Sequence, residues 1–241
     1  MPIPSDLLPG PDADQWVVLH DVTWEQYEAL RAANDTPALR FTYHEGTLEI
    51  MSPSRPHEQI KTLIARLLEA YGEERGLALD GFGSTTFRNK AKRLGLEPDE
   101  CYVLGHEEKE LPDLAIEVAL QARGVNKLAV YQGLGVPEVW FWIDDGIRVF
   151  CLRASGYEPR ARSALLPDLD LERVAEAVRS VRGPGEQTAS VRAFRASLFS
   201  SGGAKLPPPQ PRPSAASPLT AADGGEAPAA PSVAAAGRGE G

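Results

Sequence analysis

The sequence is poor in cysteine, and this limits the kinds of protein that it can encode. It has two cysteines, Cys101 and Cys151, in 241 residues, and neither lies in a CxxC or other metal-type spacing. We therefore expect two small buried apolar residues and no disulfide framework, as in a protein of the reducing cytoplasm.

Long apolar runs and a targeting segment are also missing. No run approaches the roughly 20 apolar residues that are needed to span a bilayer. The N-terminal residues MPIPSDLLPGPDADQW have neither the basic start nor the apolar core of a signal peptide. The sequence thus predicts a cytoplasmic location and no membrane partner.

Positive charge is scarce as well. Lys and Arg total 25 against 34 Asp and Glu, which gives a net charge of -9. The excess lies before Ser200, because the residues after it include three charges of each sign. An acidic domain should not bind nucleic acid tightly through bulk electrostatics. The argument weighs less against a metal nuclease, whose carboxylates need a cation before a phosphate can approach.

Composition divides the chain into three parts. Residues 1–22 are rich in Pro, Asp and Leu, and we expect them to be irregular. Residues 23–199 carry the periodic patterns of one folded domain. From Ser200 onward the chain is mainly Ser, Gly, Ala and Pro, which cannot bury enough apolar surface to offset the entropy of ordering. Residues 200–241 are therefore predicted to be a disordered tail, with LPPPQPRP as a docking peptide in the alternative interpretation.

Local patterns place the first elements of the domain. Thr23 and Gln26 form a capping-box pattern at the start of a short helix. Residues 40–43 and 48–51 are predicted strands of a hairpin that turns at Glu45-Gly46. A long helix follows residues 52–54 and ends near Gly76. Its buried stripe has helical spacing and consists of Ile60, Leu63, Ile64, Leu67, Leu68 and Tyr71.

The second half of the domain alternates strands and helices. We expect helices over residues 124–134, 171–179 and 191–199. The expected strands cover residues 77–82, 84–88, 101–104, 114–118, 137–143 and 147–152. Since residues 114–143 run strand, helix, strand with short connections, they predict a parallel crossover. The sequence therefore predicts a mixed α/β fold with a central mixed sheet flanked by helices.

Glu117 is the strongest candidate for a functional residue. It lies inside an otherwise apolar predicted strand, where a carboxylate is costly unless it is paired or binds a metal. Asp99 and Asp113 both follow a proline and compete as its partner. Asp113 is four residues away on the same strand, about 13 Å, too far to share an ion. Asp99 can converge with Glu117 if its strand pairs with residues 114–118.

Two converging carboxylates and a backbone carbonyl would suit Mg²⁺ or Mn²⁺. We take the carbonyl to be that of Val118. A phosphodiester nuclease also needs a positive group near the attacking water or the transition-state oxygens. Lys127 is the nearest candidate after Glu117, and the alternative is an ordinary solvated helix lysine. A basic stretch is either a DNA-backbone contact or a solvated loop, and comprises Arg88, Lys90, Lys92 and Arg93.

Several short motifs, in this order and spacing, resemble the Uma2 family, also called DUF820, of restriction-endonuclease-like proteins. The resemblance runs from about residue 23 to residue 199. The matching segments are residues 43–46 (YHEG), 48–53 (LEIMSP), His57, 97–101 (EPDEC), 112–118 (PDLAIEV), Lys127, Tyr131 and 135–140 (GVPEVW).

The resemblance implies a PD-(D/E)xK core, an α-β-β-β-α-β unit with a divalent-metal site. Asp99 matches its Asp and Glu117 its Asp or Glu. Ala119 stands where the motif has lysine, but the family is similar in carrying that lysine on the next helix, which Lys127 would supply. Glu45 and His57 match recurrent family positions that lie near the metal. For these two, the alternatives are a hairpin carboxylate and a helix-start side chain.

Three functions remain open from the sequence. The first is an Mg²⁺-dependent or Mn²⁺-dependent endonuclease acting on DNA, with catalytic Asp99, Glu117, Lys127, Glu45 and His57. The second is a catalytically inactive member of the fold that serves as a binding or assembly module, since a fold does not fix a function. The third is a hydrolase that acts on something other than DNA.

Trp140 and Trp142 alternate on a predicted strand and so face the same side of its sheet. They are interpreted as core residues or as the surface of a homodimer, and not as a platform for stacking bases.

Overall fold

The computed structural model describes residues 13–34, 36, 38–120 and 124–200. They all lie in the first of two compact units, residues 1–208 and 209–241. The predicted tail lies outside the described residues, except for Ser200 at the end of a helix. Residues 1–12 of the predicted N-terminal segment lie outside them too.

A six-stranded mixed sheet forms the centre of the domain, in the order β11-β10-β9-β8-β7-β4. Neighbouring strands are antiparallel except β8 and β9, which are parallel. The predicted crossover between them is therefore present. The strands are β4 (Leu79–Gly81), β7 (Glu100–Leu104), β8 (Leu114–Val118), β9 (Glu138–Ile143), β10 (Gly146–Arg153) and β11 (Gly156–Arg160).

The core of this sheet follows the order that the resemblance implied. Helix α2 (Arg55–Arg75) precedes β4, β7 and β8, and helix α3 (Lys127–Leu134) connects β8 to β9. These elements form an α-β-β-β-α-β unit whose strands are neighbours in the sheet in that same order. A hairpin of β5 (Phe87–Asn89) and β6 (Leu94–Leu96) is inserted between β4 and β7 and joins another sheet.

This second sheet has five antiparallel strands in the order β1-β3-β2-β6-β5. It contains the predicted hairpin, formed by β2 (Arg40–His44) and β3 (Thr47–Ser52). Helix α1 (Trp24–Ala33) covers it with Tyr27, whose ring stacks on Tyr43 of β2 at 4.9 Å between centroids. The predicted capping box of Thr23 and Gln26 starts α1.

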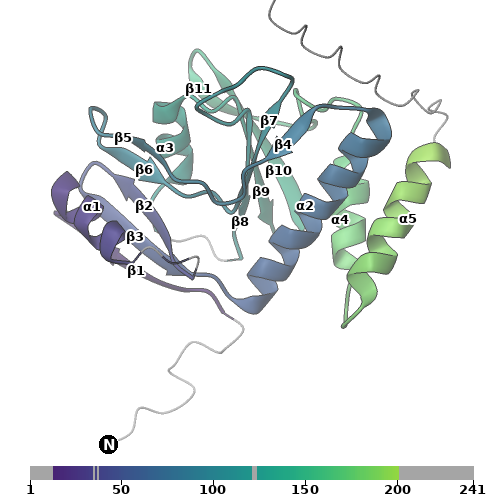
Figure 1. The fold of residues 1–241 in the computed structure, drawn as a ribbon, viewed down its shortest axis with the longest axis horizontal. Coiled ribbons are helices and arrows are strands. Elements are labelled where there is room, and N and C mark those ends of the chain that lie inside the picture. Colours follow the sequence, from purple (N-terminus) through teal and green to yellow (C-terminus); the bar gives the residue numbers. More distant parts are fainter. Residues whose placement is uncertain (1–12, 35, 37, 121–123, 201–241) are drawn as a thin grey trace, which may run out of the picture. The chain divides into compact units, whose positions relative to one another are not determined.

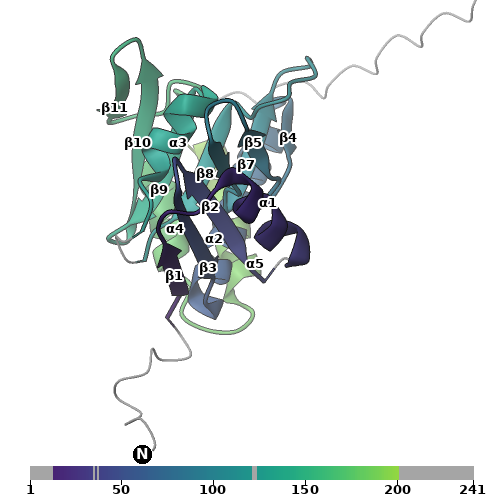
Figure 2. The same cartoon turned by 90° about the vertical axis from the view of Figure 1, so that its left-hand side faces the viewer.

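Helices and the second sheet cover opposite faces of the central sheet (Figure 1). Helices α2, α4 (Leu171–Arg179) and α5 (Glu186–Ser200) lie on one face, and α3 and the five-stranded sheet lie on the other. Figure 2 looks from the side of the five-stranded sheet, which lies in front of these three helices. The prediction of a central mixed sheet flanked by helices is confirmed.

The two alternating tryptophans belong to the core between the sheet and the helices. Trp140 and Trp142 are 1% and 2% exposed and pack in one cluster with Leu63 and Leu67 of α2. The core interpretation of these tryptophans is therefore confirmed, and they offer no surface to a second subunit.

Three strands were not predicted. Strand β1 (Gln15–Leu19) lies within residues 1–22, which were expected to be irregular, and it pairs along β3. Strand β6 has three residues with a central glycine, and β11 contains a proline. Both compositions disfavour a strand in sequence terms, and pairing with neighbouring strands overrides them here.

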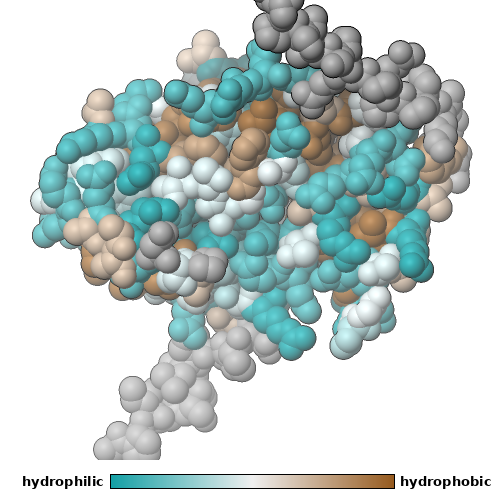
Figure 3. Space-filling model, in the orientation of Figure 1, coloured by the Kyte–Doolittle hydropathy of each residue, from teal (hydrophilic) through white to brown (hydrophobic). Residues whose placement is uncertain are grey.

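The face seen in Figure 3 is mostly hydrophilic, and its hydrophobic residues form separate patches. None of the helices in the described part of the chain combines the length and apolarity that a bilayer crossing requires.

Close packing at β6 provides a test of this fold. Gly95 pairs with Tyr43 and Arg88 on either side, and a Cβ there would meet Cζ of Tyr27 at 2.8 Å. Tyr27 is fully buried and cannot move aside. We expect Gly95→Ala to lower the free energy of unfolding in urea by about 1–3 kcal/mol through overpacking.

The control is Gly146→Ala, where the nearest atom to the new Cβ is 3.9 Å away. It should change the free energy of unfolding far less. Equal effects of the two substitutions would contradict the packing of Tyr27 over β6.

Candidate active site

The candidate site begins where β7 and β8 pair. Glu100 lies opposite Ile116, so Asp99, the residue before β7, reaches the level of Glu117. Oδ2 of Asp99 accepts a hydrogen bond from the Val118 N–H at 2.8 Å. Both acidic residues are buried, Asp99 being 0% and Glu117 1% exposed. Strand β7 therefore pairs with β8, as the predicted convergence of Asp99 and Glu117 required.

Helix α3 directs two side chains at Glu117. The helix starts at Lys127 because the Asn126 side chain caps it by accepting from the Ala129 N–H. Nζ of Lys127 donates to Oε2 of Glu117 at 2.6 Å. The hydroxyl of Tyr131, one turn later on the same face, donates to Oε1. The structure thus brings the predicted lysine onto the predicted carboxylate and adds a tyrosine.

Burial is the largest influence on the pKa values of this group. It raises the pKa of Glu117, and the like charge of Asp99 adds to this, so that the opposing effect of Lys127 is outweighed. Burial alone would lower the pKa of Lys127, but Glu117, Asp99 and Glu49 raise it overall. Lys127 is therefore held as a cation, and it is shared among several carboxylates.

A buried histidine lies on the other side of Asp99. His57, in the first turn of α2, is 0% exposed. Its Nε2 is 3.0 Å from Oδ1 of Asp99, and its Nδ1 is 3.0 Å from Oδ2 of Asp14. Burial opposes the charged ring, but the two carboxylates prevail and raise the pKa of His57 to about 9. Burial also opposes the charge of Asp99, yet His57 and Lys127 lower the pKa of Asp99 to about 2.

Asp14 orients this histidine and was not predicted. Its Oδ1 accepts from the backbone N–H of Ser54 at 2.7 Å, and Ser54 is the N-cap of α2. One carboxylate therefore fixes both the start of the helix and the imidazole ring. Since Asp14 and His57 are 43 residues apart, no local pattern in the sequence connects them.

Glu49 is the second residue that sequence reasoning missed. It is 5% exposed in β3, and its Oε2 accepts from the Val125 N–H at 3.1 Å. Burial raises its pKa, and so does Asp99. Gly124, with a φ of +89°, leaves room for this carboxylate, which a Cβ at that position would strike. The signal was available, because Glu49 is a carboxylate within a strand of apolar residues, as Glu117 is.

Other predicted residues lie away from this group. Glu45 is exposed in the turn between β2 and β3, where its backbone N–H donates to the Arg93 carbonyl. Arg93 donates to the Tyr43 hydroxyl, and Lys92 donates to the Gly133 carbonyl at the end of α3.

The remaining two basic residues pair with α1. Arg88 lies 3.7 Å from Glu28, and Lys90 lies 3.5 Å from Glu25. The basic stretch is thus a hairpin surface with partners of its own, and none of its residues lines the cavity described below.

Asp113 has a structural environment. Its Oδ2 accepts from the Leu104 N–H at 2.7 Å, and Lys109 lies 2.7 Å from the same oxygen. Its backbone continues the sheet by donating to Tyr102. These contacts support the entry to β8, and they belong to Leu104 and Lys109 and not to the group around Glu117.

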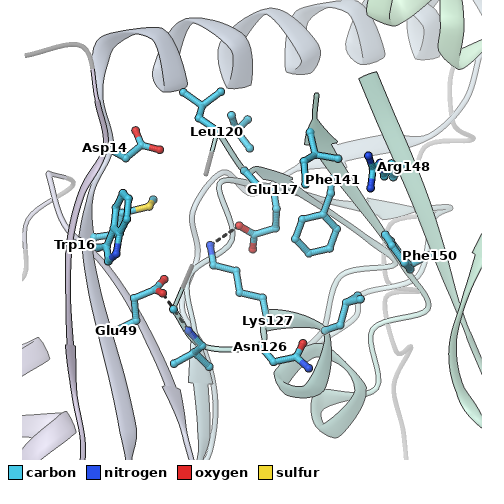
Figure 4. Close-up of a pocket in the computed structure, with 17 residues that line it drawn as sticks. Asp14, Trp16, Glu49, Glu117, Leu120, Asn126, Lys127, Phe141, Arg148 and Phe150 are labelled. Atoms are coloured by element: carbon cyan, nitrogen blue, oxygen red, sulfur yellow. Dashed lines mark hydrogen bonds and ion pairs between the residues drawn. The ribbon is translucent and has the colours of Figure 1, made fainter. Parts of the chain in front are cut away.

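A cavity of about 420 Å³ opens beside Glu117 (Figure 4). Asp14, Trp16 and Glu49 line it from the side of β1 and β3, and Phe141, Arg148 and Phe150 line it from β9 and β10. Glu117 and Lys127 lie between these two walls, joined by their ion pair. Val118 lines the cavity too. The cavity therefore borders Glu117 and Glu49, which are 1% and 5% exposed.

The donor chemistry fits a hard divalent cation. The carboxylates of Asp99, Glu117 and Glu49 and the carbonyl of Val118 are the oxygen ligands that Mg²⁺ and Mn²⁺ prefer. Burial, together with the like charge of Asp99, raises the pKa values of Glu49 and Glu117 although Lys127 lowers both.

The same carboxylates already have partners within the chain. Glu117 accepts from Lys127 and Tyr131, and Asp99 is held by His57 and Val118. Within the described ranges, no three His, Cys, Asp or Glu side chains are grouped as a metal centre. Bound cations would thus compete with these contacts.

The charge on His57 predicts how stability depends on pH in the metal-free protein. Its pKa is raised from 6.5 to about 9, so its contribution is fully present below pH 6.5 and is lost as the pH rises through 9. By linkage the loss is about 3 kcal/mol. We expect the wild type to lose that much more than His57→Gln between pH 6 and pH 9.5, in urea unfolding with a chelator present.

Asp14→Asn serves as a second variant, because it keeps the ring and removes one of its two carboxylates. It should lose less stability over this range than the wild type. Parallel pH curves for all three proteins would contradict a charged His57.

A model of a protein family matches residues 24–182 of the chain, more than half of its length. The family is Uma2, described as "Putative restriction endonuclease". No curated protein matches the chain. The matched range includes Asp99, Glu117 and Lys127, whereas Asp14 and Trp16 precede it. With its nuclease-like fold, the chain belongs to the Uma2 family.

Proposed function

We propose that this protein is a divalent-metal-dependent endonuclease that hydrolyses phosphodiester bonds of DNA. One observation carries the proposal: Lys127 from α3 meets Glu117 of β8 at 2.6 Å, opposite the buried Asp99. Family membership supports a nuclease and DNA as its substrate. The metal and the chemistry are inferred from the residues of the site.

Asp99, Glu117 and the Val118 carbonyl would hold the metal, and Glu49 is a further carboxylate on the same cavity. When bound, Mg²⁺ or Mn²⁺ neutralises charge on the scissile phosphate and lowers the pKa of a water molecule. Water then adds to phosphorus as the P–O bond to the leaving sugar breaks, and the leaving oxygen takes up a proton. The products are a phosphomonoester and an alcohol.

Lys127 has two tasks that its geometry permits. It is held as a cation by the carboxylates around it, so it can donate hydrogen bonds to the attacking water or to the phosphoryl oxygens. Tyr131 holds the other oxygen of Glu117 and fixes that carboxylate.

His57 and Asp14 act through Asp99. The charged ring keeps Asp99 ionised and in place, and Asp14 fixes the ring. We infer that both are positioning residues, since His57 contacts Asp99 and Asp14, and Asp14 contacts His57 and the Ser54 N–H. Glu45 is exposed in its hairpin turn, and the mechanism needs nothing from it.

A catalytically inactive binding or assembly module is the second candidate. The internal partners of Glu117 and Asp99 favour it, because a carboxylate group that is satisfied by the chain itself needs no metal. The net charge of -9 favours it too, since bulk electrostatics oppose binding to DNA.

Glu117→Gln separates the two functions. It should reduce cleavage of supercoiled plasmid and single-stranded DNA by about 100-fold or more in Mg²⁺ or Mn²⁺, because a neutral amide is a poor ligand for a hard cation. Binding of Mn²⁺, measured by calorimetry, should weaken in parallel.

Asp113→Asn is the matched control for that substitution. Asp113 contacts Leu104 and Lys109, so cleavage and Mn²⁺ binding should persist in this variant. Equal cleavage by wild type and Glu117→Gln would mean contamination or a wrong site. Folded proteins that neither cleave nor bind Mn²⁺ would support the inactive module.

Lys127→Met tests the role of the cation. Cleavage should fall by about 100-fold or more, because the negative charge of the transition state loses a hydrogen-bond donor. Binding of Mn²⁺ should persist or tighten, because the Lys127 ammonium no longer competes with Mn²⁺ for Glu117. The control is Lys109→Met. It removes a lysine that contacts the Leu104 carbonyl and the Asp113 carboxylate. Unchanged cleavage by Lys127→Met would remove Lys127 from the mechanism.

A further inference from the structure

The cavity beside Glu117 carries aromatic side chains that the chemistry of hydrolysis does not use. Trp16 of β1 lies on one wall, and Phe141 and Phe150 lie on the opposite one (Figure 4). The two phenylalanine rings meet edge to face at 5.8 Å between centroids. All three aromatic residues are partly exposed, so a ligand in the cavity can contact them.

The reactive groups lie at the bottom of this cavity. Glu117 is 1% exposed, and the side chain of Lys127 is 15% exposed. A phosphate that reaches them must therefore enter the cavity. An unpaired base can follow it and contact the aromatic walls, whereas a paired base stays in the stack of the duplex.

Among the described residues, few cations line the cavity. Lys127 and Arg148 are the basic residues among those that line the cavity, and Arg148 is also paired with Asp144 at 2.5 Å. Binding of a duplex through its phosphates requires many Lys and Arg contacts. These two cations match one or two phosphates, and the aromatic walls add a contact for the face of a base.

The size of the cavity agrees with this limit. Its volume of about 420 Å³ lies within the range of pockets that enclose one small ligand. Base stacking on aromatic side chains contributes about 1–3 kcal/mol per base and tolerates any sequence. The cavity therefore combines a site for a phosphate with surfaces for a base.

We propose that this cavity binds an unpaired nucleotide of single-stranded DNA, with its base against Trp16, Phe141 and Phe150 and its phosphate toward Lys127. The inference rests on the proposed function, because it assigns that site its substrate class. It states that the enzyme acts on unpaired strands in preference to a continuous duplex.

Trp16 makes the inference measurable without catalysis. The chain has four tryptophans, and the other three, Trp24, Trp140 and Trp142, are at most 5% exposed. Titration of the full chain with a thymidine hexanucleotide in Ca²⁺ should therefore quench the emission of Trp16 as the base stacks on it. Trp16→Phe should abolish this quenching but still bind a fluorescently labelled hexanucleotide, as followed by anisotropy.

Two ligands separate stacking from phosphate binding. An abasic hexamer keeps the phosphates and lacks the bases, and a blunt-ended duplex keeps both but pairs all of its bases. Each should bind at least about tenfold more weakly than the hexanucleotide and should quench little. Equal binding of either ligand, or no change in Trp16 emission with the hexanucleotide, would overturn the inference.

Substitutions on the facing wall complete the test. Phe150→Ala should weaken binding of the hexanucleotide by about tenfold, and Phe150→Leu, which keeps the apolar bulk, should also weaken it. Phe82→Ala removes an aromatic side chain that is 53% exposed outside the cavity and should change nothing. Equal affinity of the wild type and both Phe150 variants would count against a stacked base.

The inference and the proposed function can fail separately. Metal-dependent cleavage of duplex and single strands at equal rates, without quenching, would keep the nuclease and reject the unpaired nucleotide. Quenching by the hexanucleotide without any cleavage would keep the binding site and reject the nuclease.

Discussion

The register between β7 and β8 is the constraint on which the site depends. Because side chains alternate along a strand, Leu114, Ile116 and Val118 face the helices α2, α4 and α5, and Glu117 faces α3. A slip of one residue would turn Glu117 to the wrong face. The hydrogen bond from the Val118 N–H to the Asp99 carboxylate joins the neighbouring ends of the two strands within the site.

Charge explains why this arrangement is costly and why it needs two helices. Burial of a carboxylate without a partner costs several kcal/mol, and here Asp99 and Glu117 are buried together. Helix α2 supplies His57 to Asp99, and α3 supplies Lys127 to Glu117. The pKa of Glu117 is raised all the same. A site that leaves negative charge uncompensated sacrifices stability, as functional sites commonly do.

Local patterns predicted most of the fold, and long-range contacts account for what they missed. Glu117 and Lys127 could be found because a carboxylate within an apolar strand and a nearby lysine are visible in the sequence. Asp14 could not, since its partner His57 lies 43 residues away. Glu45 was chosen because it matches a recurrent family position, and Glu49 was passed over although it is a carboxylate among apolar strand residues. Strand β6 was not predicted because a central glycine disfavours a strand, and Gly95 is extended here through pairing with β2 and β5.

Strand β1 has a consequence for where a working unit of this protein begins. The matched family range starts at residue 24, yet β1 pairs with β3 along five residues and brings Asp14 to His57. A fragment that starts at residue 24 lacks β1 and Asp14. It would leave β3 as an exposed edge of the second sheet and remove the carboxylate that accepts from the Ser54 N–H. It would also open the wall of the cavity that Trp16 forms. The boundary drawn by sequence similarity and the boundary of the folded unit therefore differ, and the segment between them belongs to the site.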